Sequence, residues 1–181
     1  MRAPTSDNAR KLREAVHFVC KKMAHEPEKL GAVKLQKILW YFDVWSFVMT
    51  GSTFTGAVYI KKDYGPYTTA IHAIVNDLKR LGRLHTDVDD EYYGNEKAVF
   101  VGKGSTDLSV FTERERRRLE EITVDICESH SATSISEKSH GPVWRMSTLG
   151  EEIPFEAAAI KLFPASTETI ELIRRDLDLA R

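Results

Sequence analysis

The hydrophobic pattern of the chain is densest between Val33 and Gly51, which read VKLQKILWYFDVWSFVMTG. This stretch has no proline and no internal glycine, and five of the eight residues from Trp40 to Phe47 are aromatic. At helical spacing its apolar residues form two arcs: Leu35, Ile38, Phe42, Trp45 and Met49 on one side, and Trp40, Tyr41, Val44, Phe47 and Val48 on the other. A helix that is apolar on two sides is enclosed by its own domain. We therefore predict the central helix here, ended by Gly51 in the left-handed conformation.

A narrow polar seam separates the two arcs and consists of Gln36, Asp43, Ser46 and Thr50. A buried carboxylate is costly unless it accepts hydrogen bonds. We expect Tyr64, His140 or the backbone of the Tyr64-Gly65-Pro66 turn to supply partners for this seam. Such contacts would hold the turn against the central helix.

The remaining pattern predicts further helices and a few short strands. Before the turn we expect a helix from Ser6 or Asp7 to about Ala24, with Leu12, Val16, Val19 and Met23 inward, and a strand-like run from Phe54 to Ile60. After the turn we expect a helix from Pro66 to Leu81, stopped by Gly82, and a hairpin of Leu84–Val88 with Ala98–Val101. Capping boxes at Thr112–Glu115 and Ser134–Glu137 predict two more helix starts.

These elements indicate a mainly α protein of the α+β kind, with a small β-hairpin or sheet beside the central helix. A chain of 181 residues is expected to form a single domain over 1–181, with a loose tail at 1–5 and a C-terminal helix at 165–181. The formal net charge of −1 provides no overall basic field for nucleic acid or anionic lipid. Cys20 and Cys127 are predicted to be reduced, buried thiols.

No apolar signal core is present at the N-terminus, and Lys34, Lys37 and Asp43 interrupt the longest apolar run. The pattern therefore predicts a cytoplasmic protein without a membrane partner. His17, Cys20 and His25 lie close in sequence but lack the paired spacing of a structural zinc site. Since no acid, base and nucleophile can be assembled either, we expect no cofactor, no metal and no enzymatic activity.

Two binding functions remain open. The predicted helix ending near Lys79 and Arg80, followed by a hairpin, has the order of a winged helix, which is a DNA-binding regulator. Negative charge at Asp77 and in the hairpin counts against nucleic acid, because phosphate neutralisation dominates such affinity.

Protein binding is the other function. Trp40 and Phe47 are large, rigid side chains of the kind that anchor interfaces, unless the first and last helices cover them. Arg114 and Arg117 belong to an arginine run that is either a solvated helix face or a contact patch.

Three strings of the sequence resemble one known family, and the resemblance as a whole spans about Leu12 to Ala158. Lys34-Leu35-Gln36-Lys37-Ile38-Leu39-Trp40-Tyr41-Phe42 is similar to the KLQKLLYF helix of the Panacea domain, found in SocA-like antitoxins. Tyr64-Gly65-Pro66 resembles its YGP turn, and Ser134 to Trp144, with His140, resembles its third segment.

The resemblance implies an antitoxin that neutralises a cognate toxin, encoded nearby, by direct protein contact. It also implies that some relatives act as adaptors that hand the toxin to an energy-dependent protease. On this hypothesis the scaffold residues are Lys34, Leu35, Gln36, Tyr41, Phe42, Tyr64, Gly65, Pro66, His140 and Trp144. The hairpin, the arginine-rich helix and the C-terminal helix would then select the partner.

Overall fold

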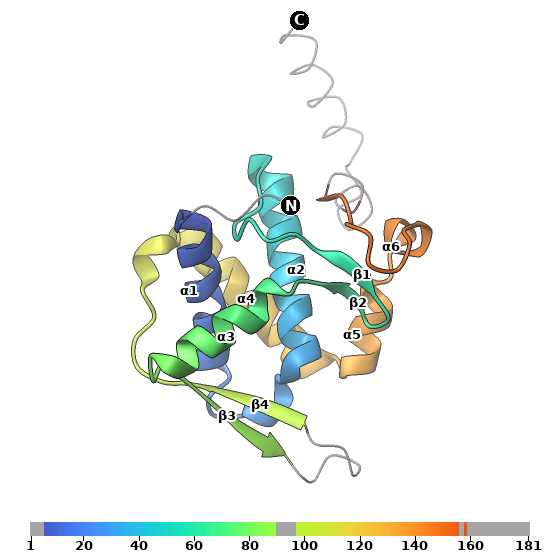
Figure 1. The fold of residues 1–181 in the computed structure, drawn as a ribbon. Helices are drawn as coiled ribbons and strands as arrows, with labels where there is room; N and C mark the ends of the chain where they lie inside the picture. Colours follow the sequence, from blue (N-terminus) through green and yellow to red (C-terminus); the bar gives the residue numbers. More distant parts are fainter. Residues whose placement is uncertain (1–5, 90–96, 156–157, 159–181) are drawn as a thin grey trace, which may run out of the picture.

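A computed structural model describes residues 6–89, 97–155 and 158. The long helix α2 (Gly31–Thr50) stands at the centre. Helices α1 (Ser6–Lys22) and α3 (Ala70–Arg80) lie on one side of it, and the β1–β2 hairpin (Ile60–Lys62 and Gly65–Tyr67) with α5 (Ala132–Ser139) and α6 (Pro142–Met146) lies on the other (Figure 1). Helix α4 (Glu113–Ser129) packs along α2. The mainly α fold with a small β part is confirmed.

The short elements complete the fold. A second antiparallel hairpin joins β3 (Leu84–Asp89) to β4 (Lys97–Gly102), with Leu84 opposite Gly102. Single 3₁₀ turns lie at Pro27–Lys29 and Leu108–Val110. The predicted tail at 1–5 and the predicted helix at 165–181 lie outside the described residues. Among the described residues, no helix combines the length and apolar character that a membrane span requires.

The two apolar arcs of α2 enter two separate clusters, as their spacing predicts. Leu35, Ile38 and Phe42 are fully buried in the main core, which also contains the inward stripes of α1 and α4. Trp40 and Val44 enter the second cluster. The loop before β1 and the segment after α6 cover this second arc, through Tyr59, Ile153 and Phe155. The first helix, which we expected there, packs instead in the main core.

The ends of α2 and α4 follow the sequence signals. Gly51 has a φ of 73° and its N–H donates to the carbonyl of Phe47, which ends α2 in the predicted left-handed cap. Thr112 and Glu115 form the predicted capping box at the start of α4. Cys20 and Cys127 are buried and form no disulfide with any described residue, also as predicted.

Two local predictions are wrong because a tertiary contact occupies the backbone, and a third is wrong in its position along the chain. Residues 54–59 form no strand, since the carboxylate of Asp43 takes the N–H of Thr55. Pro66 lies in β2 and opens no helix. Helix α3 begins only at Ala70, because the Gln36 amide binds both the N–H and the carbonyl of Thr68. The second capping box uses Ser131 with Ser134, directly after α4 ends, in place of Ser134 with Glu137.

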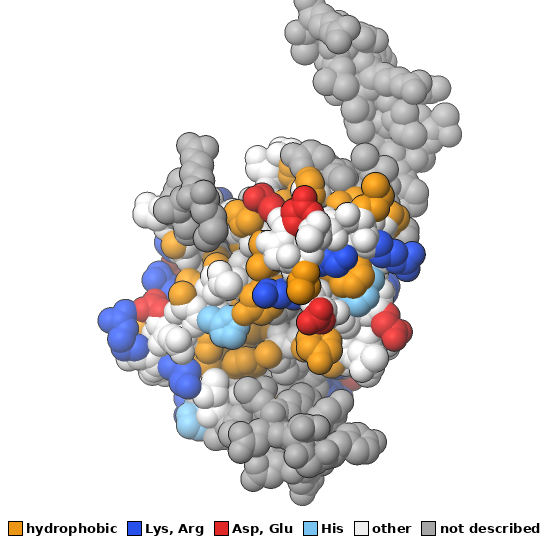
Figure 2. Space-filling model, turned by 45° about the vertical axis from the view of Figure 1, so that its right-hand side comes forward, with side chains coloured by type: hydrophobic (Ala, Val, Ile, Leu, Met, Phe, Trp, Pro, Cys, Tyr) orange, Lys and Arg blue, Asp and Glu red, His pale blue; other side chains and the backbone are white. Residues whose placement is uncertain are grey.

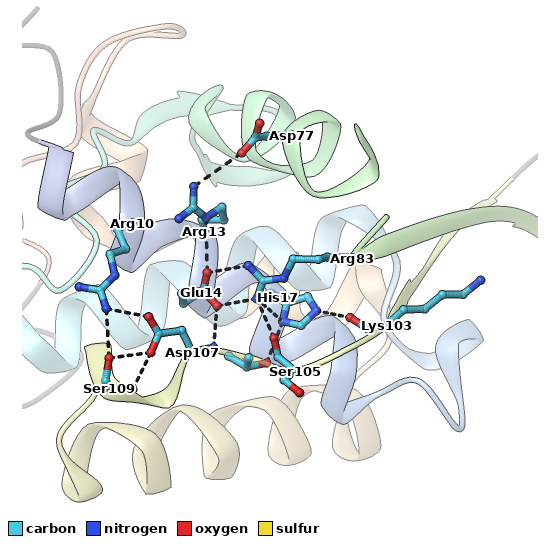
Figure 3. A network of polar contacts seen from close by, with 11 residues as sticks. Arg10, Arg13, Glu14, His17, Asp77, Arg83, Lys103, Ser105, Asp107 and Ser109 are labelled. Carbon is cyan, nitrogen blue, oxygen red and sulfur yellow. Dashed lines mark hydrogen bonds and ion pairs between the residues drawn. The ribbon is translucent and has the colours of Figure 1, made fainter. Parts of the chain in front are cut away.

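A buried ion pair fastens α1 to the segments around the second hairpin (Figure 3). Glu14 is 1% exposed, and both of its carboxylate oxygens accept from Arg83, at 2.8 and 2.7 Å. The N–H of Asp107 also donates to Glu14, at 2.9 Å. Burial raises the pKa of Glu14, but these hydrogen bonds outweigh it and leave the pKa below its usual value. The carboxylate is therefore charged and paired at neutral pH.

His17 extends this network and is fully buried. Its Nε2 lies 2.8 Å from the carbonyl of Lys103, and its Nδ1 lies 3.1 Å from Arg83. Because a carbonyl only accepts and a guanidinium only donates, Nε2 carries the proton and Nδ1 accepts. The ring is therefore neutral, and burial lowers its pKa.

This histidine makes the protein lose stability in mild acid. The pKa of His17 is lower in the folded than in the unfolded state, so the unfolded state binds more protons as the pH falls below about 6.5. The contribution of His17 is thus complete above that pH and lost below it. We expect the wild type to lose more free energy of unfolding than His17→Gln when urea denaturation is compared at about pH 7.5 and about pH 5. Parallel losses in the two proteins would contradict this assignment.

Candidate functional site

The three sequence strings meet at one place, on the side of α2 that faces the β1–β2 hairpin and α5. A small cavity of about 80 Å³ marks the junction. Its lining includes Trp40 from α2, Pro66 from β2, Ser139 from α5 and Trp144 from α6. Segments about a hundred residues apart in sequence are thereby brought into contact.

The polar residues of the first string each bind the backbone of a different segment. Lys34 Nζ donates to the carbonyl of Cys127, at 3.0 Å, in the last turn of α4, where a cation is favoured by the helix dipole. The Gln36 amide pairs with Thr68, donating to its carbonyl and accepting its N–H, both at 3.0 Å. Lys37 Nζ donates to the carbonyl of Pro66, at 2.8 Å. The string therefore fixes α4 and the hairpin to α2.

Lys37 is an unusual lysine, because its side chain is buried to 2% exposure. Burial lowers the pKa of its amine to about 7. At neutral pH the amine is therefore close to half protonated. Lys37 stands in the string from Lys34 to Phe42 that resembles the family helix, but the prediction of site residues omitted it.

Gly65 packs between α2 and α5, in a space that is too narrow for a side chain. Its φ is 96°, in the region that favours glycine. A Cβ at this position would lie 2.3 Å from Ser139 Oγ and 2.8 Å from Lys37 Nζ. The glycine of the turn is thus required both by its conformation and by the close approach of the two helices.

The third string supports the hairpin from outside. The rings of His140 and Trp144 stack with centroids 3.6 Å apart. Trp144 Nε1 donates to the carbonyl of Lys62 at 3.2 Å, and Lys61 Nζ lies 4.4 Å from the Trp144 ring centroid. Burial, and then the positive charge of Lys37, lower the pKa of His140, so its ring is neutral at neutral pH. We find no contact from Tyr64 or His140 to Asp43, which binds Thr55 and Tyr59 instead.

A groove of about 410 Å³ opens beside the hairpin, between the first turn of α2 and the first turn of α3. Ala32 and Val33 supply apolar lining, and Lys62, Asp63 and His72 supply polar groups. Tyr64, on the hairpin turn, also lines the groove and is 71% exposed. Figure 2 shows the face formed by this side of the molecule, where hydrophobic side chains alternate with cationic, acidic and histidine side chains and no single charge dominates. Such a mixed surface suits a protein partner better than a polyanion.

The four residues predicted to bind a partner lie in different surroundings. Trp40 is 2% exposed and packs on Tyr59 and Phe155, so it belongs to the core and offers no contact surface. Phe47 is partly buried and lines a broad open hollow near Gly51. Arg114 and Arg117 are exposed on α4. The remaining scaffold residues Leu35 and Phe42 are fully buried.

In this arrangement, arginines near the hairpin of the winged-helix alternative are already paired with carboxylates of the protein. Arg83, at the foot of the β3–β4 hairpin, is bound by the buried carboxylate of Glu14 and by the carbonyl of Ser105. Arg80 is paired with Asp77 on the same helix. A guanidinium that holds a buried carboxylate is not available to a phosphate, so the predicted basic end is weaker than its composition indicates.

With this geometry established, comparison with known proteins identifies the class. Residues 35–145, more than half of the chain, match the family described as antitoxin SocA-like, Panacea domain. The chain therefore belongs to the SocA-like antitoxin family, as its three strings predict. The matched region begins inside α2 and ends inside α6, and so includes Trp40, Pro66, Ser139 and Trp144 of the junction. Searches of curated proteins and of solved structures gave no match to this chain.

Proposed function

We propose that this protein neutralises a toxin encoded nearby by binding it directly, without catalysis, and that the toxin docks over the groove beside the β1–β2 hairpin. Membership of the antitoxin family supports the role. The observation that carries the proposed surface is an exposed Tyr64 beside an apolar groove, on a hairpin held to α2 by the hydrogen bond from Lys37 to the carbonyl of Pro66. Aromatic side chains on a rigid support lose little entropy on binding and commonly anchor interfaces.

The role is tested by co-expressing the protein with each neighbouring reading frame. The proposal requires one neighbour that arrests growth alone and is rescued by this protein. If every neighbour is harmless, or none is rescued, the antitoxin role fails.

The surface is tested by Tyr64→Ala. We expect at least about tenfold weaker toxin binding, near 1.4 kcal/mol, with an unchanged free energy of unfolding, because the side chain is mostly in solvent. Calorimetric titration of the purified partners gives the affinity. Leu81→Ala is the matched control, since Leu81 is 51% exposed at the other end of α3. Equal toxin affinity of the wild type and Tyr64→Ala would show that the interface lies outside the groove.

Delivery to a protease is a separate proposal that follows from the same family role. Sequestration alone leaves the toxin level unchanged, whereas an adaptor lowers it. Following the toxin by immunoblot after translation is stopped, with and without this protein, separates the two mechanisms. A toxin half-life that does not change would reject the adaptor role and leave sequestration in place.

A further inference from the structure

A second cavity, of about 220 Å³, lies on another side of α2, where it meets α4 and α5. Isoleucine side chains of α4 and α5 form apolar walls. Tyr41, Arg118, Asp125 and Lys138 supply its polar lining. This cavity shares only Lys138 with the lining of the junction cavity and shares no lining residue with the groove.

Two hydrogen-bond donors in the lining residues are buried without an acceptor. Tyr41 Oη and Arg118 Nε are closed off from solvent and have no hydrogen-bond partner among the described residues. Arg118 Nη1 donates to Glu121 at 3.1 Å, so only part of its guanidinium is satisfied. A buried donor without an acceptor has lost its hydrogen bonds to water and makes none in the protein, which destabilises the folded state. An acceptor that entered the cavity would relieve both groups.

The lining indicates the chemical class of that acceptor. Among the lining residues Arg118 and Lys138 are cations and Asp125 is an anion, and Glu121 is already paired with Nη1 of Arg118, so Nε is the part of the guanidinium left without an acceptor. A carboxylate offers two acceptor oxygens and pairs strongly with a guanidinium. The isoleucine walls suit a methylene stem, whereas a dianionic phosphate would leave excess negative charge beside Asp125. The Arg118 side chain is 36% exposed, so part of it borders solvent beside the cavity.

We propose that this cavity is a carboxylate-binding pocket that receives an aspartate or glutamate side chain of the partner protein. Tyr41 Oη and Arg118 Nε donate to the two carboxylate oxygens. The identity of the partner as a toxin rests on the proposed function, but the chemistry of the pocket does not. The first experiment therefore needs no toxin.

The pocket is probed with the methylamide of N-acetylglutamate, and the methylamide of N-acetylglutamine serves as the neutral isostere. In ¹⁵N-labelled protein, the Arg118 Nε–H resonance is expected to shift with the glutamate compound and not with the glutamine compound. Tyr64→Phe, which removes a hydroxyl elsewhere, should preserve the shift, and Tyr41→Phe should abolish it. No shift up to the solubility limit, or equal shifts with both compounds, would overturn the proposal.

The stability of Tyr41→Phe provides an independent test. Removing a hydroxyl that has no partner should leave the urea midpoint of the free protein unchanged or raise it. A lower midpoint would mean that the hydroxyl is already paired inside the protein, for example with Arg118, and would refute the pocket. Loss of ligand binding together with retained stability is therefore the expected signature.

The last test uses the toxin complex. Tyr41→Phe and Arg118→Lys are expected to weaken toxin binding by about tenfold. Arg116→Lys, on the same helix and similarly exposed, should bind as the wild type does. If Tyr41→Phe binds as tightly as the wild type, the toxin does not use this pocket and the inference is wrong. If the wild type binds no toxin, the proposed function fails, and the resonance shift still decides whether the pocket binds carboxylates.

Discussion

Gly65→Ala is expected to lower the free energy of unfolding by about 4 kcal/mol, which combines left-handed strain with overpacking of the junction. The φ of 96° already disfavours any residue with a side chain. The added Cβ would also fall 2.3 Å from Ser139 Oγ and 2.8 Å from Lys37 Nζ, so these buried side chains, or the elements that carry them, would have to shift. Urea denaturation followed by circular dichroism measures the loss.

Two controls separate the cost of the left-handed backbone conformation from the cost of the steric overlap of the added Cβ. Gly82→Ala has a similar left-handed backbone, with a φ of 67°, but a Cβ there meets nothing within 4 Å. Only the conformational part, about 1 kcal/mol, is expected for it. In the Gly65→Ala background, Ser139→Ala removes the nearest colliding atom and should recover part of the lost stability. If Gly65→Ala and Gly82→Ala lower the free energy of unfolding by the same amount, the close packing at the junction does not contribute to the loss of stability in Gly65→Ala.

Asp43→Ala is expected to lower the free energy of unfolding by about 4 kcal/mol, because it leaves buried donors without an acceptor and opens a small cavity in the core. The Asp43 carboxylate is fully buried. It accepts from the N–H of Thr55 at 2.8 Å, from the Thr55 hydroxyl, and from Tyr59 Oη at 3.1 Å. These bonds hold residues 54–59 over the second cluster. Denaturant unfolding measures the loss, and Thr50→Ala, at the exposed end of the same polar seam, is the control with little expected cost.

The titration of Asp43 provides a second measurement on the same residue. Burial raises its pKa to about 6, and the hydrogen bonds from Thr55 and Tyr59 oppose that rise. The folded state therefore binds this proton more tightly than the unfolded state, where the pKa is near 3.8. The stabilisation is complete below about pH 3.8 and is lost as the pH rises through about 6. Asp43→Asn should lack this dependence, and a wild type whose pH profile matches that of Asp43→Asn would contradict it.

Local signals predicted the elements whose ends are determined locally. The two arcs of α2, the glycine that ends it and the capping box of α4 depend on spacing and on side chains three or four residues away. Such interactions are present in the sequence itself. The failures around Phe54 and Pro66 have the opposite origin, since Asp43 and Gln36 reach across from α2 to occupy backbone groups.

The candidate site was predicted in its parts and not in its arrangement. The strings containing Gln36, Gly65 and Trp144 were recognised, yet the expected partners of Asp43 were wrong, and the pattern left open whether Trp40 is exposed or covered. Lys37 and Ser139 were not predicted as site residues, although both approach Gly65. Spacing along one helix shows which residues share a face, but it does not show which distant segment covers that face.

The sequence alone determined the class of fold, the central position of the aromatic helix and the family, because periodicity, caps and strings are local properties. Only the tertiary structure decided that Trp40 is core, that Glu14 and His17 are buried, and that two unpaired donors share a cavity beside α4. The physical reason is that burial and hydrogen-bond satisfaction depend on groups far apart in the chain. Their free energies are set only when the segments meet.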